Sequence, residues 1–589
     1  MNAQVVTPPA SEVPIPPKPQ TDSTARQKTD TIKSPFGRAP LPRSTDIGPA
    51  YEWDREQLFA SGAYTLADLL DRIPELTTFR TGWLASPKLA SVNGDFGKIR
   101  VFYDGVELDN LDSRSGSMLD LTTVDLWTLE HVVIERGANE VRIHLRSWRV
   151  DNTDPYTRTD IYTGDENTNL YRGFYGKRWD SGAGLQLAGQ NFGTRSARLG
   201  GGGDALSLMG RFGIAKKMWS VDAFGFRRNA SRTLQPTFGN GLSLPPFEGT
   251  STLAYIRAAL GNQSGGGWAH VIASFMQLAE TSKHSDAAAA QANHVIRDTT
   301  DTTTKRAQYV IAAGYSKGFL STTAEDRIRA FDDNITHTPS ARIQVGGSRA
   351  VASLYGEHNG ATGRTRGDAL VRLTPVPFAA LSGAASYEAP DHVADDAVTR
   401  QGIPSVPRTT SARFEAGLKL VNPWLIGGFV TRDTAVLTPP TVFDSAYTYQ
   451  TVGRRNGVYA GLRGRLYKDV NIDVVGTRWD SAGFYQPKYQ TRSEINLNTR
   501  WLRKFPSGNF GLKLAAIYEY RTEVSFPTAS GVRQTNPSGV ASALLELRIL
   551  RGVASVQVRN PFGELYQIVP DFYMPRSITI YGLRWEFSN

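Results

Sequence analysis

The residue types that commonly carry out catalysis are sparse in this sequence. It contains no cysteine, which excludes thiolate metal sites, cysteine nucleophiles and disulfides. The eight histidines lie far apart, and none forms the His-Glu-x-x-His or His-x-x-Glu-His pair that holds zinc. We interpret His131, His144 and His270, which fall on predicted strands, as structural residues. The sequence therefore predicts no catalytic residues and a protein that is not an enzyme.

Two further groups of residues have the composition of a ligand site without its spacing. Gly200–Gly203 has the glycine content of a nucleotide-binding loop, but no Lys-Ser or Lys-Thr follows it. Five aspartates between predicted strands could suggest calcium, but they lack the spacing of an EF-type loop. These aspartates are Asp109, Asp112, Asp120, Asp125 and Asp151. We interpret the glycines as a flexible loop and the aspartates as solvated loop carboxylates, and we predict neither a metal site nor a cofactor.

The formal net charge of +10 is compatible with binding to nucleic acid or to anionic lipid. However, lysine and arginine are scattered along the chain, with no basic block and no nucleic-acid motif. We interpret them as solvated groups, and we expect no nucleic-acid partner. No window offers eighteen uninterrupted apolar residues, so no transmembrane helix is predicted. Met1–Pro17 lacks the features of a secretory signal peptide, so we expect a mature form or a truncated record.

The last fourteen residues, Arg576–Asn589, alternate between two kinds of side chain. Side chains alternate along a strand with a period of two, so one face ends in an aromatic and apolar band and the other carries Arg584 and Glu586. The band consists of Tyr581, Leu583, Trp585 and Phe587. This pattern is typical of the closing strand of a membrane β-barrel, with the band toward lipid and the charges toward a wet lumen. A soluble edge strand could show the same alternation, so the rest of the chain must decide.

From Tyr156 onward, predicted strands follow one another and are separated by connections that alternate between short and long. We count about 22 antiparallel strands, an even number that suits an outer-membrane barrel. The long loops are predicted at Asn229–Gly249, Glu280–Thr304, Ala389–Thr409, Asp433–Gly453, Thr522–Ser538 and Asn560–Met574. Short turns on one side and long loops on the other predict a barrel over residues 151–589, with the loops outside the cell.

Two regions precede the predicted barrel. Residues 1–50 hold ten of the 32 prolines and almost no periodic apolar pattern, so we predict a disordered, extended tail. Residues 51–150 predict a small α+β domain. Thr65–Ile73 has helical apolar spacing with Thr65 as N-cap and Pro74 as the stop. Asp104-Gly105 after Lys98–Tyr103 is a hairpin signal.

Three segments of residues 51–150 resemble, in order, the plug domain of TonB-dependent outer-membrane receptors. They are Leu66–Pro74, Arg100–Val106 and Leu129–Gly137. The signature residues within them are Leu69, Leu70, Pro74, Asp104, Gly105, Glu135, Arg136 and Gly137. The barrel resembles this family in its architecture, strand count and closing aromatic strand rather than by motif. The resemblance implies an all-β membrane barrel of about 22 antiparallel strands closed around a small α+β plug domain.

The resemblance also implies a function and partners. It implies an outer-membrane receptor and transporter that carries a scarce ligand, such as a ferric chelate or a glycan, into the periplasm. The implied partners are the energy-coupling protein TonB, outer-membrane lipid and lipopolysaccharide, the barrel-assembly machinery and an unknown small-molecule or glycan substrate. The candidate for the TonB box, the segment that TonB pulls in this family, is Asp30-Thr31-Ile32-Lys33.

Two questions stay open at this point. A plugged outer-membrane barrel with a structural or adhesion role, and with no energised transport, would have the same sequence pattern. The identity of the substrate also stays open, although basic groups in the lumen would favour an anionic ligand such as a ferric chelate or an acidic glycan.

Overall fold

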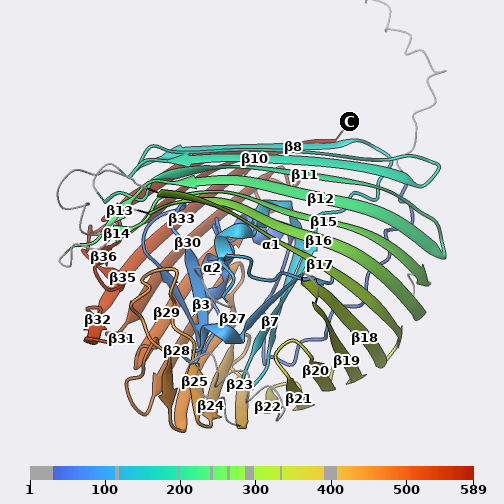
Figure 1. Cartoon of the computed structure of the whole chain (residues 1–589). Helices are drawn as coiled ribbons and strands as arrows, with labels where there is room; N and C mark the ends of the chain where they lie inside the picture. Colours follow the sequence, from blue (N-terminus) through green and yellow to red (C-terminus); the bar gives the residue numbers. More distant parts are fainter. Residues whose placement is uncertain are drawn as a thin grey trace, which may run out of the picture.

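The chain forms a closed antiparallel β-barrel with a small mixed domain inside it (Figure 1). A computed structural model describes residues 31–112, 118–196, 199–238, 243–261, 265–284, 298–331, 334–390 and 408–588. Within these ranges 22 strands close the barrel, which confirms the predicted fold class of a plugged all-β membrane barrel. No helix of these ranges has the length and apolar character needed to cross a membrane.

The barrel strands follow one another in chain order, and the last pairs with the first. They are β8 (Tyr156–Gly164), β9 (Thr168–Arg178), β10 (Ala183–Thr194), β11 (Gly203–Ala215), β12 (Trp219–Arg232), β15 (Phe247–Gly261), β16 (Gly266–His284), β17 (Asp298–Lys317), β18 (Leu320–Phe331), β19 (Asn334–Gly346), β20 (Ala350–Asn359), β21 (Arg364–Val376), β22 (Ala379–Pro390), β23 (Thr409–Lys419), β24 (Trp424–Arg432), β27 (Arg455–Tyr467), β28 (Val470–Trp479), β29 (Tyr489–Thr499), β30 (Phe510–Arg521), β33 (Ser538–Ile549), β34 (Gly552–Arg559) and β37 (Ile578–Ser588).

Alternation of side chains gives the barrel an apolar outside and a charged inside. In β23, Phe414 is exposed on the outer face, whereas its neighbours Arg413 and Glu415 are buried in the lumen. The same alternation recurs around the wall, because successive residues of a strand point to opposite faces. Closure leaves no strand edge unpaired, which is what a backbone in contact with lipid requires.

The connections differ in length between the two ends of the barrel. At the end where β8 begins and β37 finishes, nine of the ten connections have two to four residues, and 500–509 is the longer one. We call this the turn end. The strands that flank the predicted long loops meet these loops at the opposite end, which we call the loop end. The predicted bounds of Glu280–Thr304 are wrong, because β16 continues to His284 and β17 begins at Asp298. Connections such as 165–167 and 360–363 are short exceptions to the predicted alternation. Small hairpins stand on the loop end, such as β31–β32 (Ser525–Thr528 and Gly531–Gln534), at the left of Figure 1.

In the described parts of these loops there are four two-stranded sheets. Besides β31–β32 they are β13 (Gln235–Pro236) with β14 (Ser243–Leu244), β25 (Ala435–Leu437) with β26 (Gln450–Val452), and β35 (Gln567–Val569) with β36 (Phe572–Tyr573). Aromatic and aliphatic side chains of these hairpins and of the inner domain form one apolar cluster, in which Phe79 packs edge-on against Phe526. The loop end is therefore folded onto the inner domain rather than standing clear of it.

The inner domain, drawn in blue in Figure 1, combines a five-stranded sheet with short helices. The sheet has the order β1-β6-β7-β4-β5, with only β4 and β7 parallel among its neighbours. Its elements are β1 (Glu52–Asp54), α1 (Arg55–Ala60), α2 (Leu66–Leu70), β2 (Leu76–Arg80), β3 (Lys88–Val92), η1 (Phe96–Lys98), β4 (Ile99–Tyr103), β5 (Val106–Glu107), η3 (Leu121–Thr123), η4 (Leu126–Thr128), β6 (Leu129–Arg136) and β7 (Val141–Ser147). We call the elements from β1 to β7 the plug.

Two local predictions for the plug match its structure. Thr65 precedes α2, and both its backbone N–H and its hydroxyl donate to the Asp68 carboxylate, at 2.9 Å each. Asp104 and Gly105 join β4 to β5 with φ of 52° and 96°. Positive φ at both central residues is the geometry of a type I′ turn, which Asp-Gly favours.

Residues 31–50 differ from the predicted disordered tail, because they pack against both the plug and the barrel. We call residues 34–50 the strap. Phe36 and Ile47 are each 1% exposed, and the strap crosses the turn end. Side chains of the barrel wall satisfy its backbone: Gly37 N–H donates to Ser220 at 2.8 Å, and Ser382 donates to Thr45 O at 2.7 Å. The proline content does exclude regular secondary structure here, but it does not exclude docking of an extended chain onto polar side chains.

The outward face of β37 generates a prediction about membrane depth. Leu583, Trp585 and Phe587 point outward and are exposed, and they approach the turn end in that order. An outward arginine costs roughly 2–4 kcal/mol at the bilayer midplane and about 0–1 near the interface. We expect Leu583→Arg to reduce the yield of folded, heat-modifiable barrel most, Trp585→Arg less and Phe587→Arg least. Equal yields of the three variants would contradict the outward assignment of this face.

Candidate functional site

The plug signature residues fall into two groups, apolar residues of the plug core and charged residues that reach the barrel wall. Leu69 and Leu70 lie in α2 and are fully buried, and Pro74 follows the helix in the turn before β2. Leu69 and Leu70 pack in the large apolar cluster that also contains Trp127 and Trp148. These signature residues therefore hold the plug together.

Asp104 connects the tip of the β4–β5 turn to the barrel. Its carboxylate accepts hydrogen bonds from Arg211 of β11 at 2.8 Å and from Tyr255 of β15 at 2.7 Å. Arg38 of the strap lies 3.4 Å away on the other carboxylate oxygen. Burial alone would raise the pKa of Asp104, but Arg38, Arg211 and Arg257 outweigh burial and hold the pKa below its usual range.

Glu135 and Arg136 make the corresponding contacts at the end of β6. Arg342 of β19 donates to both oxygens of Glu135, at 2.6 and 2.8 Å. Arg136 donates to Glu415 of β23 at 2.9 Å, and in the same place to Asp46 of the strap at 3.0 Å. The next signature residue, Gly137, is needed because an added Cβ would lie 2.7 Å from the Glu140 carbonyl oxygen.

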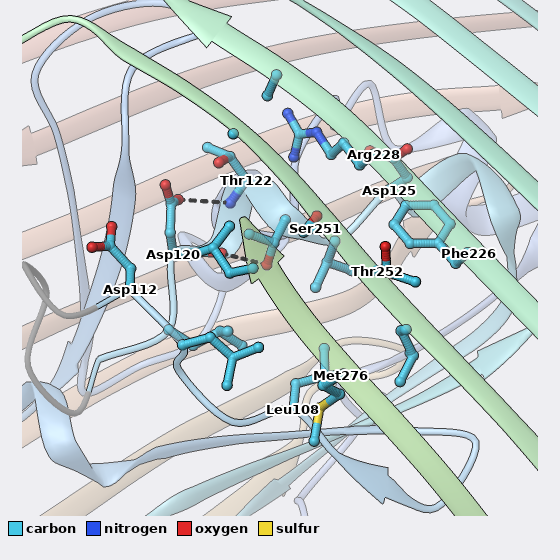
Figure 2. Close-up of a pocket in the computed structure, with 18 of the residues that line it drawn as sticks. Leu108, Asp112, Asp120, Thr122, Asp125, Phe226, Arg228, Ser251, Thr252 and Met276 are labelled. Carbon is cyan, nitrogen blue, oxygen red and sulfur yellow. Dashed lines mark hydrogen bonds between the residues drawn. The ribbon is translucent and has the colours of Figure 1, made fainter. Parts of the chain in front are cut away.

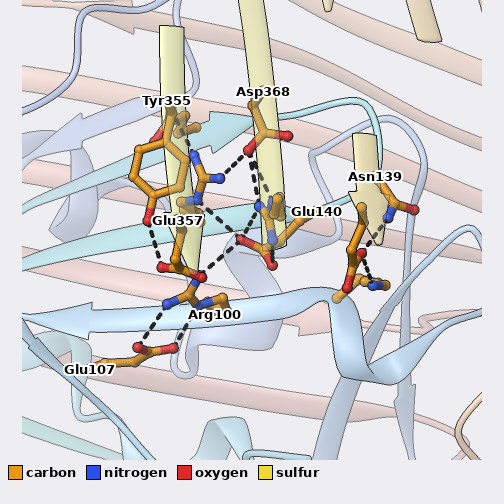
Figure 3. A network of polar contacts seen from close by, with 12 residues as sticks. Arg100, Glu107, Asn139, Glu140, Tyr355, Glu357 and Asp368 are labelled. Atoms are coloured by element: carbon orange, nitrogen blue, oxygen red, sulfur yellow. Dashed lines mark hydrogen bonds and ion pairs between the residues drawn. The ribbon is translucent and has the colours of Figure 1, made fainter. Parts of the chain in front are cut away.

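A larger ionic network crosses the boundary between plug and barrel next to these residues (Figure 3). Arg100 of β4 donates to Glu107 at 2.6 and 2.9 Å and to Glu357 of β20 at 2.7 Å. Glu140 accepts a hydrogen bond from Arg366 of β21. Arg142 of β7 is paired with Asp368, which also lies in β21. Tyr355 adds a hydroxyl donor to Glu357 at 2.6 Å.

This network fixes the plug because its members are buried. Burial would raise the pKa of Glu107, but Arg100, Arg329 and Arg327 hold the pKa well below its ordinary value of 4.5. The pKa of Glu135 is likewise lowered, since Arg342 and Arg142 outweigh its burial. Removing one partner of a buried pair leaves an uncompensated charge, at a cost of about 3–5 kcal/mol. Each contact that crosses from plug to wall therefore opposes displacement of the plug.

Sequence reasoning missed most of this network. From the sequence, the alternation of side chains predicts only that the barrel partners Glu357, Arg366 and Asp368 face the lumen. Many other charged residues of the barrel have the same prediction. What the pattern could have indicated is that an inward-facing charge in a plugged barrel needs a counter-charge on the plug. Which plug residue supplies it depends on how the plug sits in the lumen.

A cavity of about 160 Å³ lies at the loop end, between the plug and strands β10, β11, β12, β15 and β16 (Figure 2). The plug contributes residues 108–112, 119–120, 122–125 and 128 to its lining, and the wall contributes side chains such as Arg228 and Met276. Four of the five aspartates that we interpreted as solvated loop carboxylates line this one cavity: Asp109, Asp112, Asp120 and Asp125. Asp151 lies apart from it, where its carboxylate is paired with Arg149 at 3.1 Å.

That interpretation is therefore wrong for Asp125, which is buried, and incomplete for the others. No group of three or more His, Cys, Asp or Glu side chains in the described part of the chain could hold a metal ion. The histidines also have separate surroundings: His144 stacks on Phe102 with ring centroids 5.3 Å apart, whereas His270 lies in β16. Gly200–Gly203 leads into β11 at the loop end.

The remaining candidate residues lie at the barrel seam and at the turn end. Tyr581, Leu583, Trp585 and Phe587 point outward along β37, whereas Arg584 is buried on the lumen side. Of the TonB-box candidate, Asp30 lies outside the described residues. Thr31–Lys33 forms an antiparallel bridge with residues 151–153, in which Ile32 is opposite Asn152. Lys33 N–H donates to Asp151 O at 2.9 Å, and Thr153 N–H donates to Thr31 O at 3.1 Å.

No family model matches the chain, and no curated protein matches it. Several solved structures share its fold. The siderophore receptor PirA from Acinetobacter baumannii has a TM-score of 0.67 and 10% identity, covering 91% of this chain and 98% of that one. The FrpB iron transporter from Neisseria meningitidis (F3-3 variant) has a TM-score of 0.67 and 9% identity, covering 89% and 97%. A mutant of the ferric enterobactin receptor PfeA from Pseudomonas aeruginosa has a TM-score of 0.67 and 10% identity, covering 91% and 98%.

These likenesses establish the fold. The chain has the plugged-barrel fold of outer-membrane receptors and transporters, as its resemblance to TonB-dependent receptors implied. All three proteins are described as receptors or transporters. At about one identical residue in ten, the alignment does not transfer a ligand.

The position of Arg136 predicts that one substitution will loosen the plug while the barrel stays closed. Arg136→Gln leaves Asp46 buried without its cation and leaves Glu415 with Arg413 as its remaining cation, so we expect a loss of about 3–5 kcal/mol in the free energy that holds the plug against the wall. The measurement is trypsin cleavage of the purified protein in detergent, with heat-modifiable migration as the test for an intact barrel.

Arg257→Gln is the matched control, because Arg257 is equally buried, its ion pair is with Asp222 inside the barrel wall at 2.9 Å, and it acts on the plug only through its longer-range attraction of Asp104. We expect it to lower the melting temperature of the barrel without exposing the plug to trypsin. Equal protease resistance of wild type and Arg136→Gln would contradict the assignment of Arg136 as a lock between plug and wall.

Acid should loosen the plug as well. Glu107 and Glu135 have a lower pKa in the folded protein than in the unfolded chain, so the folded state binds fewer protons. Their contribution to stability is therefore complete above a pH of about 4.5 and is lost as the pH falls through the folded-state pKa. We expect the melting temperature of Glu135→Gln to lie below that of wild type at pH 6, and the gap to narrow toward pH 3. Melts followed by tryptophan fluorescence test this, and a gap that is constant with pH would refute it.

Proposed function

We propose that this protein is an energised uptake receptor of the bacterial outer membrane, in which the plug closes the barrel until a partner in the periplasm pulls on residues near Ile32. The observation that carries the proposal is the arrangement of the plug. It is tied to the wall by buried ion pairs, it borders a cavity at the loop end, and it is tied at the turn end to the N-terminal strap. A plug with a ligand side and a pulling side is what uptake against a gradient needs.

The free edge at Ile32 supports the pulling role. The hydrogen bonds between the two segments are made by the residues on either side of Ile32 and Asn152, not by these two residues themselves. The N–H and C=O of Ile32 therefore point away from Asn152. The Ile32 side chain is 81% exposed. A docked, extended segment with an outward edge is a template to which another chain can add a strand, with affinity from main-chain hydrogen bonds. We propose that TonB is that chain, and that Asp30–Lys33 is the segment it holds.

The strap supports transmission of the pull. It continues directly from Lys33 and contacts plug and wall in turn: Arg38 pairs with Glu130 of β6 at 2.7 Å, and Arg43 donates to Gly318 O at the β17–β18 turn at 2.5 Å. Further along, Asp46 pairs with Arg136 at 3.0 Å. Tension applied at Ile32 therefore reaches the contacts of Arg38 and Arg43 first and the Asp46–Arg136 pair at the end of β6 last.

In this proposal the loop end faces the outside of the cell and captures the ligand, and the turn end faces the periplasm. The apolar outer face contacts outer-membrane lipid and lipopolysaccharide, and the barrel-assembly machinery inserts the barrel. The folds shared with a siderophore receptor and an iron transporter make a scarce nutrient the first ligand class to test. The competing reading is a plugged barrel with a structural or adhesion role, which needs neither a pull nor a free edge at Ile32.

Substitution of Ile32 separates the two readings. Ile32→Pro removes an outward N–H but leaves the Thr31 and Lys33 contacts with residues 151–153 in place. We expect cells carrying Ile32→Pro to lose accumulation of the nutrient that the wild-type protein supplies, while surface expression and heat-modifiable barrel remain unchanged. The assay is growth on single iron or carbon sources, with deletion of residues 1–33 as the complete loss.

Ile32→Ala is the matched control, since it shortens the side chain and keeps the N–H. It should retain uptake, because strand addition depends on the main chain. Uptake that survives both Ile32→Pro and the deletion would end the energised reading and favour the passive barrel. Equal loss in the alanine and proline variants would show that the side chain, not the edge, is what matters.

A further inference from the structure

Among the described residues, two charged side chains of the loop-end cavity have neither a hydrogen-bond nor an ion-pair partner. Asp125 of the plug and Arg228 of β12 are each only 6% exposed, and both line the cavity (Figure 2). Asp125 Oδ2 and Arg228 Nε are buried without a hydrogen bond, and no ion pair holds either residue within the described ranges. A buried charge without a partner is costly, so a site that keeps two of them is built for a ligand that supplies the missing partners.

The other aspartates of the cavity are already engaged by the protein. Asp109 pairs with Arg306 at 2.9 Å, and Asp120 accepts from the backbone N–H of Thr122 at 2.9 Å. Asp204, at the margin, accepts from Ser231 at 2.6 Å. These carboxylates line the cavity and contribute to its electrostatic potential. Because they already have protein partners, they do not need a partner from a ligand, unlike Asp125 and Arg228.

Apolar groups occupy the wall of the cavity between the charged positions. They include Leu108 and Val124 from the plug and Phe192, Phe226, Leu253 and Met276 from the barrel. The guanidinium of Arg228 lies 5.7 Å from the ring centroid of Phe192, which keeps the cation against an aromatic face. The cavity thus combines one free anion, one free cation and an apolar lining.

We propose that the cavity binds a small zwitterionic, peptide-like molecule. Its ammonium group pairs with Asp125, its carboxylate pairs with Arg228, and its apolar side chains contact Phe226 and Met276. This inference rests on the proposed function, because it names the ligand class of the same loop-end site. It also ties ligand to mechanism, since one charge of the ligand is held by the plug and the other by the wall.

The sign of the lining argues against the anionic ligand that lumen charges suggested from the sequence. Five aspartates and two arginines line the cavity, Asp204 and Arg232 among them. An acidic lining repels a multiply charged anion, whereas a ligand with its own ammonium group is neutral overall and gains a pair at each end.

Binding to the purified full-length protein in detergent tests the ligand class without transport. The probe is the dipeptide Leu-Phe, compared with its N-acetyl form, which lacks the ammonium, and its C-terminal amide, which lacks the carboxylate. We expect Leu-Phe to bind, and each blocked form to bind at least about tenfold more weakly, the loss expected for a charged hydrogen bond. Isothermal titration calorimetry gives the affinities.

The variants assign each end of the probe to a residue. Asp125→Asn should lower the affinity for Leu-Phe by about tenfold or more, and N-acetylation of the probe should then cause no further loss of affinity. Arg228→Gln should lower the affinity by a similar factor, and C-terminal amidation should then cause no further loss. Asp301→Asn, at an exposed position of β17 outside the cavity, is the matched control and should bind like wild type. Heat-modifiable migration checks that every variant is folded.

The outcomes separate this inference from the proposed function. No binding of Leu-Phe to wild type, or the same blocking losses in wild type and both variants, would overturn the zwitterionic ligand. Binding with these assignments, in a protein whose uptake survives Ile32→Pro and tail deletion, would keep the ligand site and end the energised reading. Uptake that is lost in Ile32→Pro but unaffected by Asp125→Asn and Arg228→Gln would keep the transporter and end this ligand class.

Discussion

The pairing of β37 with β8 is the interaction on which the rest of the molecule depends. It converts a row of hairpins into a closed wall, so that every strand has two neighbours and no main-chain edge meets lipid. Closure also separates the two faces of every strand. Apolar side chains such as Leu583 turn to the outside, and charged side chains such as Arg584 are enclosed in the lumen.

An enclosed lumen of charges is stable only if each charge finds a partner, and here the plug supplies many of them. Arg100, Glu135 and Arg136 stand opposite charges of β19, β20 and β23, and they are themselves buried by the contact. Such pairs contribute less net stability than their number suggests, because both ions are desolvated. Their effect is to fix the position of the plug in the barrel, since all of the ion pairs form together in one arrangement of plug and wall.

The two ends of the plug are held in different ways, which gives the molecule a direction. At the loop end, hairpins cover an apolar cluster, and a separate cavity between plug and wall retains Asp125 and Arg228 without ion-pair partners among the described residues. At the turn end, an extended strap crosses the plug and makes bonds of backbone to side chain that can be released one at a time. An element that is closed by hydrophobic packing on one side and by serial polar contacts on the other is suited to binding on the first side and to being pulled on the second.

The sequence by itself determined the barrel, its approximate strand count, the ends to which loops and turns belong, and the local structure of the plug. These features depend on period-two alternation, on the Asp104-Gly105 turn and on the capping of α2, all of which act between residues that are near in the chain. Only the tertiary structure decided that residues 34–50 dock as a strap, that Asp109, Asp112, Asp120 and Asp125 converge on one cavity, and that Glu135 meets Arg342. Those contacts join segments far apart in the chain, and many alternative pairs of charges would satisfy the same sequence pattern, so the seating of one rigid body inside another selects among them.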